Sequence, residues 1–583
     1  MDSITKAGEI WKQYQDGVKY QQSMGFTTDF PKFISFKEGD QWAAVTENTK
    51  NLPRPVFNIT EMFIRAKRAA ITNQGLSLTY TPLEVFDDEE QQAKAEQGAK
   101  DFTDFAKIMW ENLDQEELNN EFVDDSVTVG TGILHYYWNS NKKGGNQLKW
   151  QGDMEGEVLD PLNVFFANPH RRKVQEQEWI IIQDRLTVKA VQEMARQEGV
   201  PEELVRLIGA DNNQSGEYTA ETKEVTENDK ITVLIKYFKK DGAVYYSKSI
   251  ANMVIVDDRL LTPEVEGLGY KMSLYPIAIM SCIRRKKCIY GLGYAQDVIA
   301  VNKALNQLNG MELLNAIQCG NPAVVVTPNA IRQKLTNQGG QIITDYSPDG
   351  NGIRYLQPPA FSTIFSRLGN EMFELVRTTT GVTDVSTGET LGANMAASAI
   401  IALQNQAKTP IKELQNRYFS AIKEVGDIWL EFFKAYYNTD RNMAVENEEG
   451  KVENRIFNGS QYADIDYKLK VEVAVATDKE TLAVSLLDSM RQREDINKEQ
   501  YVELMPDAAM PFKTQIKDIW AKEKQDVLVQ AMGQIKQQQM IIDQLQSQQG
   551  NAQKSNELLG QALGQIKQQE ELMGGMGNEM QGM

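Results

Sequence analysis

Four carboxylates recur at helical spacing in the N-terminal part of the chain. Glu117, Glu121, Asp124 and Asp125 fall on one face of a predicted helix, because residues three and four apart are neighbours on a helix surface. Carboxylates gathered in this way can bind divalent metal ions, which nucleases use to activate water. A solvated carboxylate face gives the same pattern, and we favour that interpretation. A metal-dependent DNA-processing enzyme is the alternative that this cluster leaves open.

Other metal-binding and nucleotide-binding patterns are missing from the sequence. It contains three cysteines and two histidines: Cys282, Cys288, Cys319, His135 and His170. None has the paired spacing of a zinc site or a disulfide framework, so we expect free thiols in or near a core. Gly291-Leu292-Gly293 lacks the third glycine of a dinucleotide-binding loop, and no Gly-x-x-x-x-Gly-Lys-Ser/Thr loop occurs. We expect no cofactor and no metal, so any ATP hydrolysis must come from a partner.

The densest basic run is Arg284-Arg285-Lys286-Lys287. It could contact the phosphates of DNA, and a solvated turn or a row of salt bridges between subunits would use the same residues. Arg171-Arg172-Lys173 we interpret as ordinary surface. A formal net charge of −19 argues against a protein that grips nucleic acid over its whole surface, since tight binding needs clustered lysine and arginine. An acidic wall would instead let DNA slide past.

The elements that position these residues mix helices with strands. Apolar periodicity predicts helices over 4–22, 59–72 and 88–112, and strands over 133–138, 179–184, 231–238 and 243–247. We interpret 27–289 as one large α+β domain in which the polar stretch 211–229 is a surface insertion. No apolar run approaches the roughly 20 residues of a membrane span, and the first residues lack a secretion signal, so we expect assembly in the cytoplasm.

Two helices flank a small mixed module in the next part of the chain. The first, over 290–318, has an apolar stripe of Val298, Val301, Leu305, Leu308 and Leu313, and its other faces carry Asn302, Asn306 and Asn309. The module follows over 319–359, and the second helix covers about 361–380. A polar, glycine-rich loop over 381–395 leads to a long helix that we expect to bend at Pro410, which lacks an amide hydrogen. Farther on, a helix begins at Asp478 and ends before Met505.

The tail from Lys522 has a different composition. Apolar residues there recur at coiled-coil spacing on a surface dominated by glutamine: Leu528, Met532, Ile535, Ile542 and Leu545. This seam favours a coiled coil over 522–570, followed by a disordered end over 571–583. A coiled-coil scaffold or adaptor is therefore a second alternative, although a purely helical scaffold would lack the predicted strands.

Short landmarks in a fixed order carry a family resemblance. They are Gly39-Asp40-Gln41-Trp42, Arg54-Pro55-Val56-Phe57-Asn58, Gly130-Thr131-Gly132, Asp160-Pro161 before Asn163-Val164-Phe165, Tyr275-Pro276 and Tyr290-Gly291-Leu292-Gly293. In this order they resemble the portal proteins of tailed double-stranded DNA bacteriophages, and the tail resembles the helical barrel of some short-tailed phages. The resemblance implies a non-enzymatic head-to-tail connector of the virion, with an α+β portal-type fold.

The resemblance also implies names for the parts of the chain. They are an N-terminal helix (1–26), the wing (27–289), the stem helices (290–318 and 360–380), the clip (319–359), the channel loop (381–395), the long helix and its return to the wing (396–476), the crown (477–521) and the barrel (522–570).

Function and partners follow from the same resemblance. It implies a homo-oligomeric ring of about twelve copies at one capsid vertex, through which double-stranded DNA is packaged and ejected without sequence specificity. Its partners would be the terminase large subunit, the major capsid and scaffolding proteins, and tail adaptor proteins, with no membrane. The channel loop would present Thr383, Asp384, Ser386, Thr387, Gly388, Glu389 and Asn394 to DNA. The clip residues Arg332, Lys334 and Arg354 would face the packaging motor or DNA.

Overall fold

The computed structural model describes residues 3–73, 75–211, 230–262, 270–334, 336, 342–356, 363–380, 409–446, 452–473, 478–493, 495–505, 510, 512–547 and 558–568. They belong to two units, Met1–Ala474 and Val475–Met583, which we describe separately. No helix among these residues has the length and apolar character that crossing a membrane requires.

Two antiparallel sheets organise the first unit. The larger has the strand order β4-β5-β6-β7-β8, with bounds Val164–Phe166, Trp179–Thr187, Lys230–Lys240, Ala243–Ile250 and Met253–Leu260. The smaller has the order β3-β2-β9, with bounds Trp150–Val158, Thr131–Gly144 and Ile277–Ser281. All the predicted strands are present within these elements, and the α+β class is confirmed. Residues 212–229, most of the expected insertion, lie outside the described residues.

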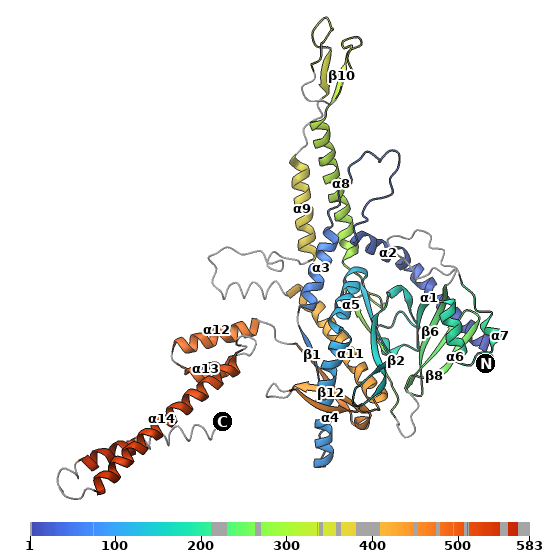
Figure 1. The fold of residues 1–583 in the computed structure, drawn as a ribbon. Helices are drawn as coiled ribbons and strands as arrows, with labels where there is room; N and C mark the ends of the chain where they lie inside the picture. The colour runs from blue at the N-terminus through green and yellow to red at the C-terminus, as the bar shows by residue number, and fades with distance from the viewer. Residues whose placement is uncertain are drawn as a thin grey trace. The chain divides into compact units, whose positions relative to one another are not determined.

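Helices cover these sheets (Figure 1). Their bounds are α1 Ser3–Ser23, α2 Phe26–Lys37, α3 Ile59–Thr72, α4 Glu89–Asn112, α5 Gln115–Val129, α6 Val188–Gln197, α7 Glu202–Val205 and α11 Thr409–Tyr436. The helix α1 buries Ile10 and Tyr14 against Phe165, Ile181 and Leu234 of the larger sheet. The three helices predicted in this region are therefore confirmed, because each has one apolar face that a sheet or a neighbouring helix covers.

The chain returns to this body after α11. Strand β14 (Tyr467–Val473) pairs antiparallel with β1 (Leu76–Pro82), and β12 (Arg441–Glu446) pairs with β13 (Val452–Phe457). Around these strands Phe102, Phe105 and Phe433 form a buried aromatic cluster, in which the Phe102 and Phe433 rings stack with centroids 6.2 Å apart. This cluster holds the late segment 409–473 to helix α4, far away in the sequence.

Two helices lead away from the sheets. Helix α8 (Ala295–Gly320) and helix α9 (Thr363–Thr380) lie side by side, and the two-stranded sheet of β10 (Ala323–Val326) and β11 (Ile353–Leu356) lies at their far end (Figure 1). The first helix begins at Ala295 and not at Tyr290, because residues 290–294 form the connection described below. Asn302 and Asn306, which lie off the predicted apolar stripe, are buried as well.

The second unit is helical in its described residues. It contains α12 (Asp478–Gln492), α13 (Lys498–Leu504), α14 (Lys513–Ser547) and a helical stretch over 558–568. The single helix predicted from Asp478 to Met505 is divided in two, because the Asn497 side chain caps α13 by accepting the Gln500 amide hydrogen at 2.8 Å. Helix α14 begins before Lys522, so the expected boundary between crown and barrel falls inside one continuous helix.

Candidate functional site

Three glycines fix the chain where it enters α8. Gly130 ends α5 with a φ of 103°, a left-handed conformation that favours glycine. A β-carbon at Gly291 would collide with the Gly130 carbonyl oxygen, and one at Gly293 would collide with the Thr128 carbonyl oxygen. The backbones of two glycine landmarks therefore touch, and no larger residue fits without a shift of the main chain.

Hydrogen bonds hold the same connection on both sides. The Gly291 amide donates to Thr131 Oγ1 at 2.9 Å, and the Tyr294 amide donates to the Val127 carbonyl oxygen at 2.8 Å. Ile283 and Leu292 exchange two backbone hydrogen bonds of 2.9 and 3.1 Å. The start of α8 is thus joined to the end of α5 and to the segment after β9. We call this arrangement the glycine joint.

A buried polar cluster holds the next two turns of α8. Asn302 donates to Gln41 Oε1 at 3.0 Å and to the Phe57 carbonyl oxygen at 2.9 Å. Its own Oδ1 accepts from the amide and the hydroxyl of Thr60, both at 3.0 Å. Asn306 donates to the same Gln41 oxygen at 2.6 Å and accepts from the Phe57 amide at 3.0 Å. A buried amide side chain is tolerated only when its donors and acceptors are paired, as these are.

The N-terminal landmarks supply the partners of this cluster. Gln41 also donates to the Phe36 carbonyl oxygen at 3.0 Å and to Asn58 Oδ1 at 2.9 Å. Asn58 in turn caps α3 by accepting the Glu61 amide hydrogen at 3.2 Å. We call Gln41, Asn58, Thr60, Asn302 and Asn306 the amide cluster. Sequence reasoning identified the landmarks but not this role, and the signal was present, since two asparagines four residues apart share one helix face.

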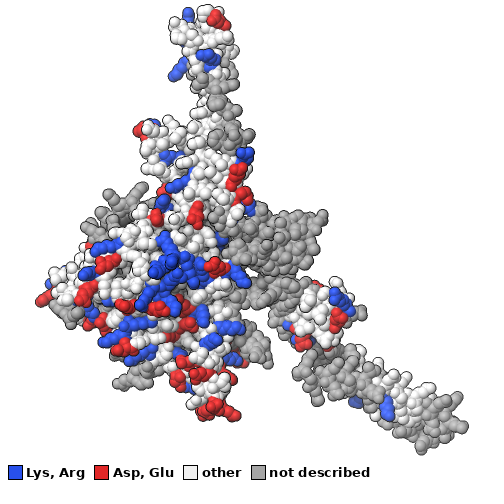
Figure 2. Space-filling view, turned by 180° about the vertical axis from the view of Figure 1, so that it is seen from behind, with Lys and Arg blue, Asp and Glu red and all other residues white. Residues whose placement is uncertain are grey.

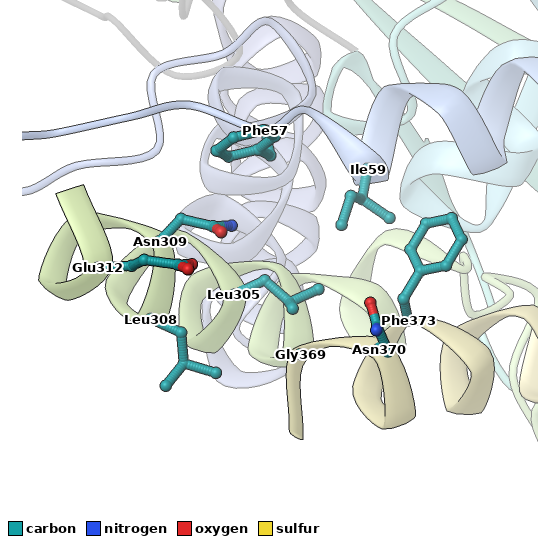
Figure 3. Close-up of a pocket in the computed structure, with 9 residues that line it drawn as sticks. All are labelled: Phe57, Ile59, Leu305, Leu308, Asn309, Glu312, Gly369, Asn370 and Phe373. Carbon is teal, nitrogen blue, oxygen red and sulfur yellow. The ribbon is translucent and has the colours of Figure 1, made fainter. Parts of the chain in front are cut away.

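A cavity opens between α8 and α9, beyond the amide cluster. It has a volume of about 460 Å³. Its lining residues come from both helices and from the segment before α3: Phe57, Ile59, Leu305, Leu308, Asn309, Glu312, Gly369, Asn370 and Phe373 (Figure 3). The floor is apolar, because Leu305 is buried and Phe373 packs on Phe63 with ring centroids 6.1 Å apart. Asn309, Glu312 and Asn370 supply polar groups, and Gly369 of α9 lies opposite Leu305.

The basic run lies just before the glycine joint. Arg284, Lys286 and Lys287 are exposed, and the Arg285 guanidinium lies 5.4 Å from the centre of the Phe26 ring. Together with Tyr20 and His170, residues 285–288 line an open cavity of about 570 Å³. The face shown in Figure 2 carries a dense group of Lys and Arg side chains on the body below the stem helices. The exposed side chains of Arg284, Lys286 and Lys287 are available to an anionic partner.

The other predicted contact residues are placed in part. Arg332, Lys334 and Arg354 are all exposed near β10 and β11, and the Arg332 guanidinium lies 4.8 Å from the centre of the Tyr346 ring. The predicted channel-loop residues, 383–394, lie outside the described residues. Helix α11 begins at Thr409, so Pro410 stands in its first turn, and the residues before it, on which the predicted bend depends, are not described. In the predicted seam Ile542 is buried and Met532 is exposed, whereas the side chains of Leu528 and Leu545 lie outside the description.

The acidic face on α5 is divided, because Glu117 and Glu121 are exposed whereas Asp124 and Asp125 are partly buried. Asp124 accepts ion pairs from Lys37 of α2 and from Arg68 of α3, the latter at 3.1 Å. Burial and the nearby Asp160, Asp124 and Glu121 carboxylates raise the pKa of Asp125 to about 8. Burial also raises the pKa of Glu121. Within the described residues no group of three or more His, Cys, Asp or Glu side chains is arranged to hold a metal ion.

The histidines and cysteines differ in their contacts and their exposure. His135 contacts Glu157 at 2.8 Å and Tyr237 at 3.0 Å inside the body. Cys282 and Cys288 are buried free thiols, as expected, but Cys319 is exposed near the end of α8. The expectation of a core position was wrong for Cys319, because the outer half of α8 has no covering layer within the described residues.

Comparison with known proteins finds one family model that matches part of the chain. Residues 325–574 match the family model described as phage P22-like portal protein. No curated protein matches the chain. Among solved structures, one described as the neck of an empty GTA particle, computed with C6 symmetry, is 10% identical, with coverage of 76% of this chain and 88% of that chain and a TM-score of 0.32. Overlap at that level does not establish a shared fold, so the family match carries the conclusions that follow.

Proposed function

We propose that this chain, a structural protein of the phage portal family and not an enzyme, forms a homo-oligomeric ring at one capsid vertex. The ring is the conduit through which double-stranded DNA enters and leaves the capsid. The observation that carries the proposal is the match of residues 325–574 to the P22-like portal model. Several landmarks add support, because those around Gln41, Phe57 and Gly130 meet at the base of α8 although they come from distant parts of the sequence.

The parts of the ring are assigned from the architecture. We assign α8 and α9 to the stem, the β10–β11 module to the clip that docks the terminase motor, and the two-sheet body to the wing. The second unit would supply the crown and the barrel, and residues 381–395 the channel loop. The glycine joint and the amide cluster support the stem assignment, because a stem must stay in a fixed orientation to the wing while DNA moves past it.

The charge of the chain suits passage better than tight binding. With a formal net charge of −19, the chain would repel phosphates over most of its surface. Local contacts would fall to exposed basic residues such as Arg284, Lys286 and Lys287. A phosphate contact of this kind positions DNA without reading its sequence. We propose that the terminase, capsid, scaffolding and tail adaptor proteins are the protein partners of the ring.

The direct test is electron microscopy of the purified full-length chain, which should show rings with a central hole. Light scattering under the same conditions should give the mass of a closed oligomer of about a dozen copies. A chain that stays monomeric at every protein and salt concentration would contradict the proposal. The DNA contact has a separate test. Replacing Arg284, Lys286 and Lys287 together by Gln should leave rings intact and reduce packaged DNA, with Arg171→Gln as the control.

A further inference from the structure

Helix α9 carries an apolar ridge that is only partly covered within the described residues. Leu368, Met372 and Leu375 recur at four- and three-residue steps, so they lie along one face of the helix. Leu368 is 37% exposed and Leu375 is 58% exposed, and Met372 between them is partly buried. The buried face of α9 carries Phe373 and Val376, which pack against Phe63 and Val298. Leu368 and Leu375 therefore remain in water beside the packing between α9 and its own body.

The cavity between α8 and α9 lies on the other flank of the same helix. At about 100° per residue, Asn370 on the cavity wall lies about 140° around α9 from Leu375 and about 160° from Leu368. Gly369, Asn370 and Phe373 also line the cavity, and all three lie between Leu368 and Leu375 in the chain. The ridge and the cavity are thus at the same level along α9 and face in nearly opposite directions.

We infer that the α9 ridge of one copy docks into the α8–α9 cavity of the next copy. The inference rests on the proposed ring and names the surfaces that close it. The ridge and the cavity lie at the same height along α9. A rotation about an axis parallel to α9, with no shift along that axis, therefore brings the ridge of one copy to the cavity of the next. A head-to-tail contact repeated by pure rotation closes into a ring, whereas a shift along the axis would give a filament.

The size and chemistry of the cavity fit this occupant. A cavity of about 150 Å³ lined by apolar side chains holds a benzene ring, so 460 Å³ has room for two or three apolar side chains. Phe57, which lines the cavity, is 50% exposed in the single chain and would be covered. The polar groups of Asn309, Glu312 and Asn370 would form a rim around an apolar centre, the arrangement typical of protein interfaces.

Arg367 and Glu312, at the outer end of the proposed contact, carry opposite charges. Arg367 precedes the ridge and is 74% exposed, and Glu312 ends the α8 wall of the cavity. Both lie toward the β10–β11 end, because α8 runs outward and α9 runs back. In the single chain Arg367 lies 3.4 Å from Glu371 of its own helix. Docking would bring a neighbour's Glu312 toward this pair and add a favourable charge contact at the rim.

The experiment uses cysteines on the two flanks of α9. A full-length chain with Cys319→Ser, Leu368→Cys and Asn370→Cys is assembled and oxidised. The two new thiols point to opposite sides of one helix and cannot reach each other within a chain. They come together only between neighbours, so denaturing gels should show a ladder of covalent multimers. The Leu368→Cys variant alone should give no covalent product, since the contact does not join two ridges.

Each outcome decides one question. Rings that yield no ladder, or that yield dimers with Leu368→Cys alone, overturn the inference and leave the proposed function standing. A wild-type chain that forms no rings overturns the proposed function. As a second readout, Leu368→Asp with Leu375→Asp should raise the concentration for half-assembly by about tenfold or more. The control Leu207→Asp, at a 76% exposed site away from α9, should leave it unchanged. Equal assembly of both variants would also count against the inference.

Discussion

The inner and outer halves of α8 differ in what surrounds their side chains: the inner half is buried and hydrogen-bonded, and the outer half is exposed. In the inner half, Asn302 is fully buried and pairs with Gln41, Phe57 and Thr60 of the same chain. In the outer half every residue from Met311 to Leu313 is exposed, and Ile317 is 52% exposed. One helix thus passes from a region complete in a single chain to a region that leaves apolar surface in water.

This difference separates the half of α8 whose packing is complete within one chain from the half whose packing is not. Buried polar groups that are fully paired fix one geometry, because any other arrangement leaves a donor or an acceptor without a partner. Apolar surface in water favours association with whatever covers it. The paired inner half therefore fixes the direction of α8 within one chain, and under the proposed assembly the outer half would gain stability when a neighbour covers its apolar surface. The predictions below test the two halves in turn.

The largest effect is expected at the glycine joint. Gly291→Val should lower the free energy of unfolding of the first unit by about 3 kcal/mol or more, because the side chain collides with the Gly130 backbone, which cannot move aside. Thermal unfolding followed by circular dichroism measures the change. Gly8→Ala is the matched control, since a β-carbon there meets nothing within 4 Å, and it should be neutral or slightly stabilising. Similar melting temperatures for both variants would contradict the claim that the glycine joint has no room for a side chain at Gly291.

The amide cluster comes next. Asn302→Leu removes the partner of the Thr60 amide and the Thr60 hydroxyl, and one of the two donors to Gln41 Oε1, while keeping side-chain volume. Leaving buried polar groups unpaired should cost about 2–4 kcal/mol in the free energy of unfolding. Asn309→Leu changes the same residue type two turns farther along α8, at a partly exposed position, and should change it by less than about 0.5 kcal/mol. Urea denaturation of the unassembled chain gives both values, and equal losses would show that the cluster has no special role.

Much of the fold is predictable because it depends on local periodicity. Strand β5 is a run of β-branched and aromatic residues, and α3 begins at Asn58, which caps it, so both were expected close to their true positions. The division between α12 and α13 was missed because it depends on one capping asparagine, Asn497, inside a sequence that otherwise favours helix. A single cap is a weak local signal beside a helical pattern.

The glycine joint and the amide cluster were not predicted as sites, although several of their residues stand in the landmarks. As a set, those landmarks resemble the portal family. Asn302 and Asn306 were recognised only as lying off the apolar stripe of their helix, where a polar residue normally faces water. Their partner, Gln41, lies 261 and 265 residues away. No local pattern encodes a pairing over such a distance, and only the folded chain brings the three amides together.

The acidic face of α5 gives a smaller, pH-dependent effect. Because the folded-state pKa of Asp125 is raised to about 8, the folded chain holds a proton that the unfolded chain releases near pH 4. Stability therefore falls as pH rises from about 4 to 8. Asp125→Asn should remove this slope and gain about 1–2 kcal/mol at pH 8, an amount reduced for the group's partial exposure. Melting temperatures across pH 5–9 test this.

Asp124→Asn is the control for that change, because it breaks the pairs with Lys37 and Arg68 and should destabilise the chain at neutral pH. Two variants next to each other on one helix thus have opposite expected signs at pH 8. If Asp125→Asn is destabilising at pH 8, the carboxyl is ionised there and the raised pKa is wrong. If both variants are neutral, the acidic face is only a solvated surface.

The smallest effect is expected when the long helix of the second unit is removed. Because α14 begins at Lys513, a truncation at Lys522 would leave a partial helix, so the chain should end at Phe512 instead. If the stem closes the ring, this truncated chain should form rings at a concentration within about twofold of wild type, since it keeps the α9 ridge, the cavity and the glycine joint. Isolated helices are marginally stable in water, and Met532 of α14 is 56% exposed. We therefore expect the ring to bring the tails together by tethering them, and we do not expect the tails to drive ring formation. Light scattering and electron microscopy of the truncated chain show whether ring formation depends on the tail. Loss of rings on truncation, with an unchanged melting temperature of the first unit, would show that the tail assembles the ring and that the stem contacts follow from it.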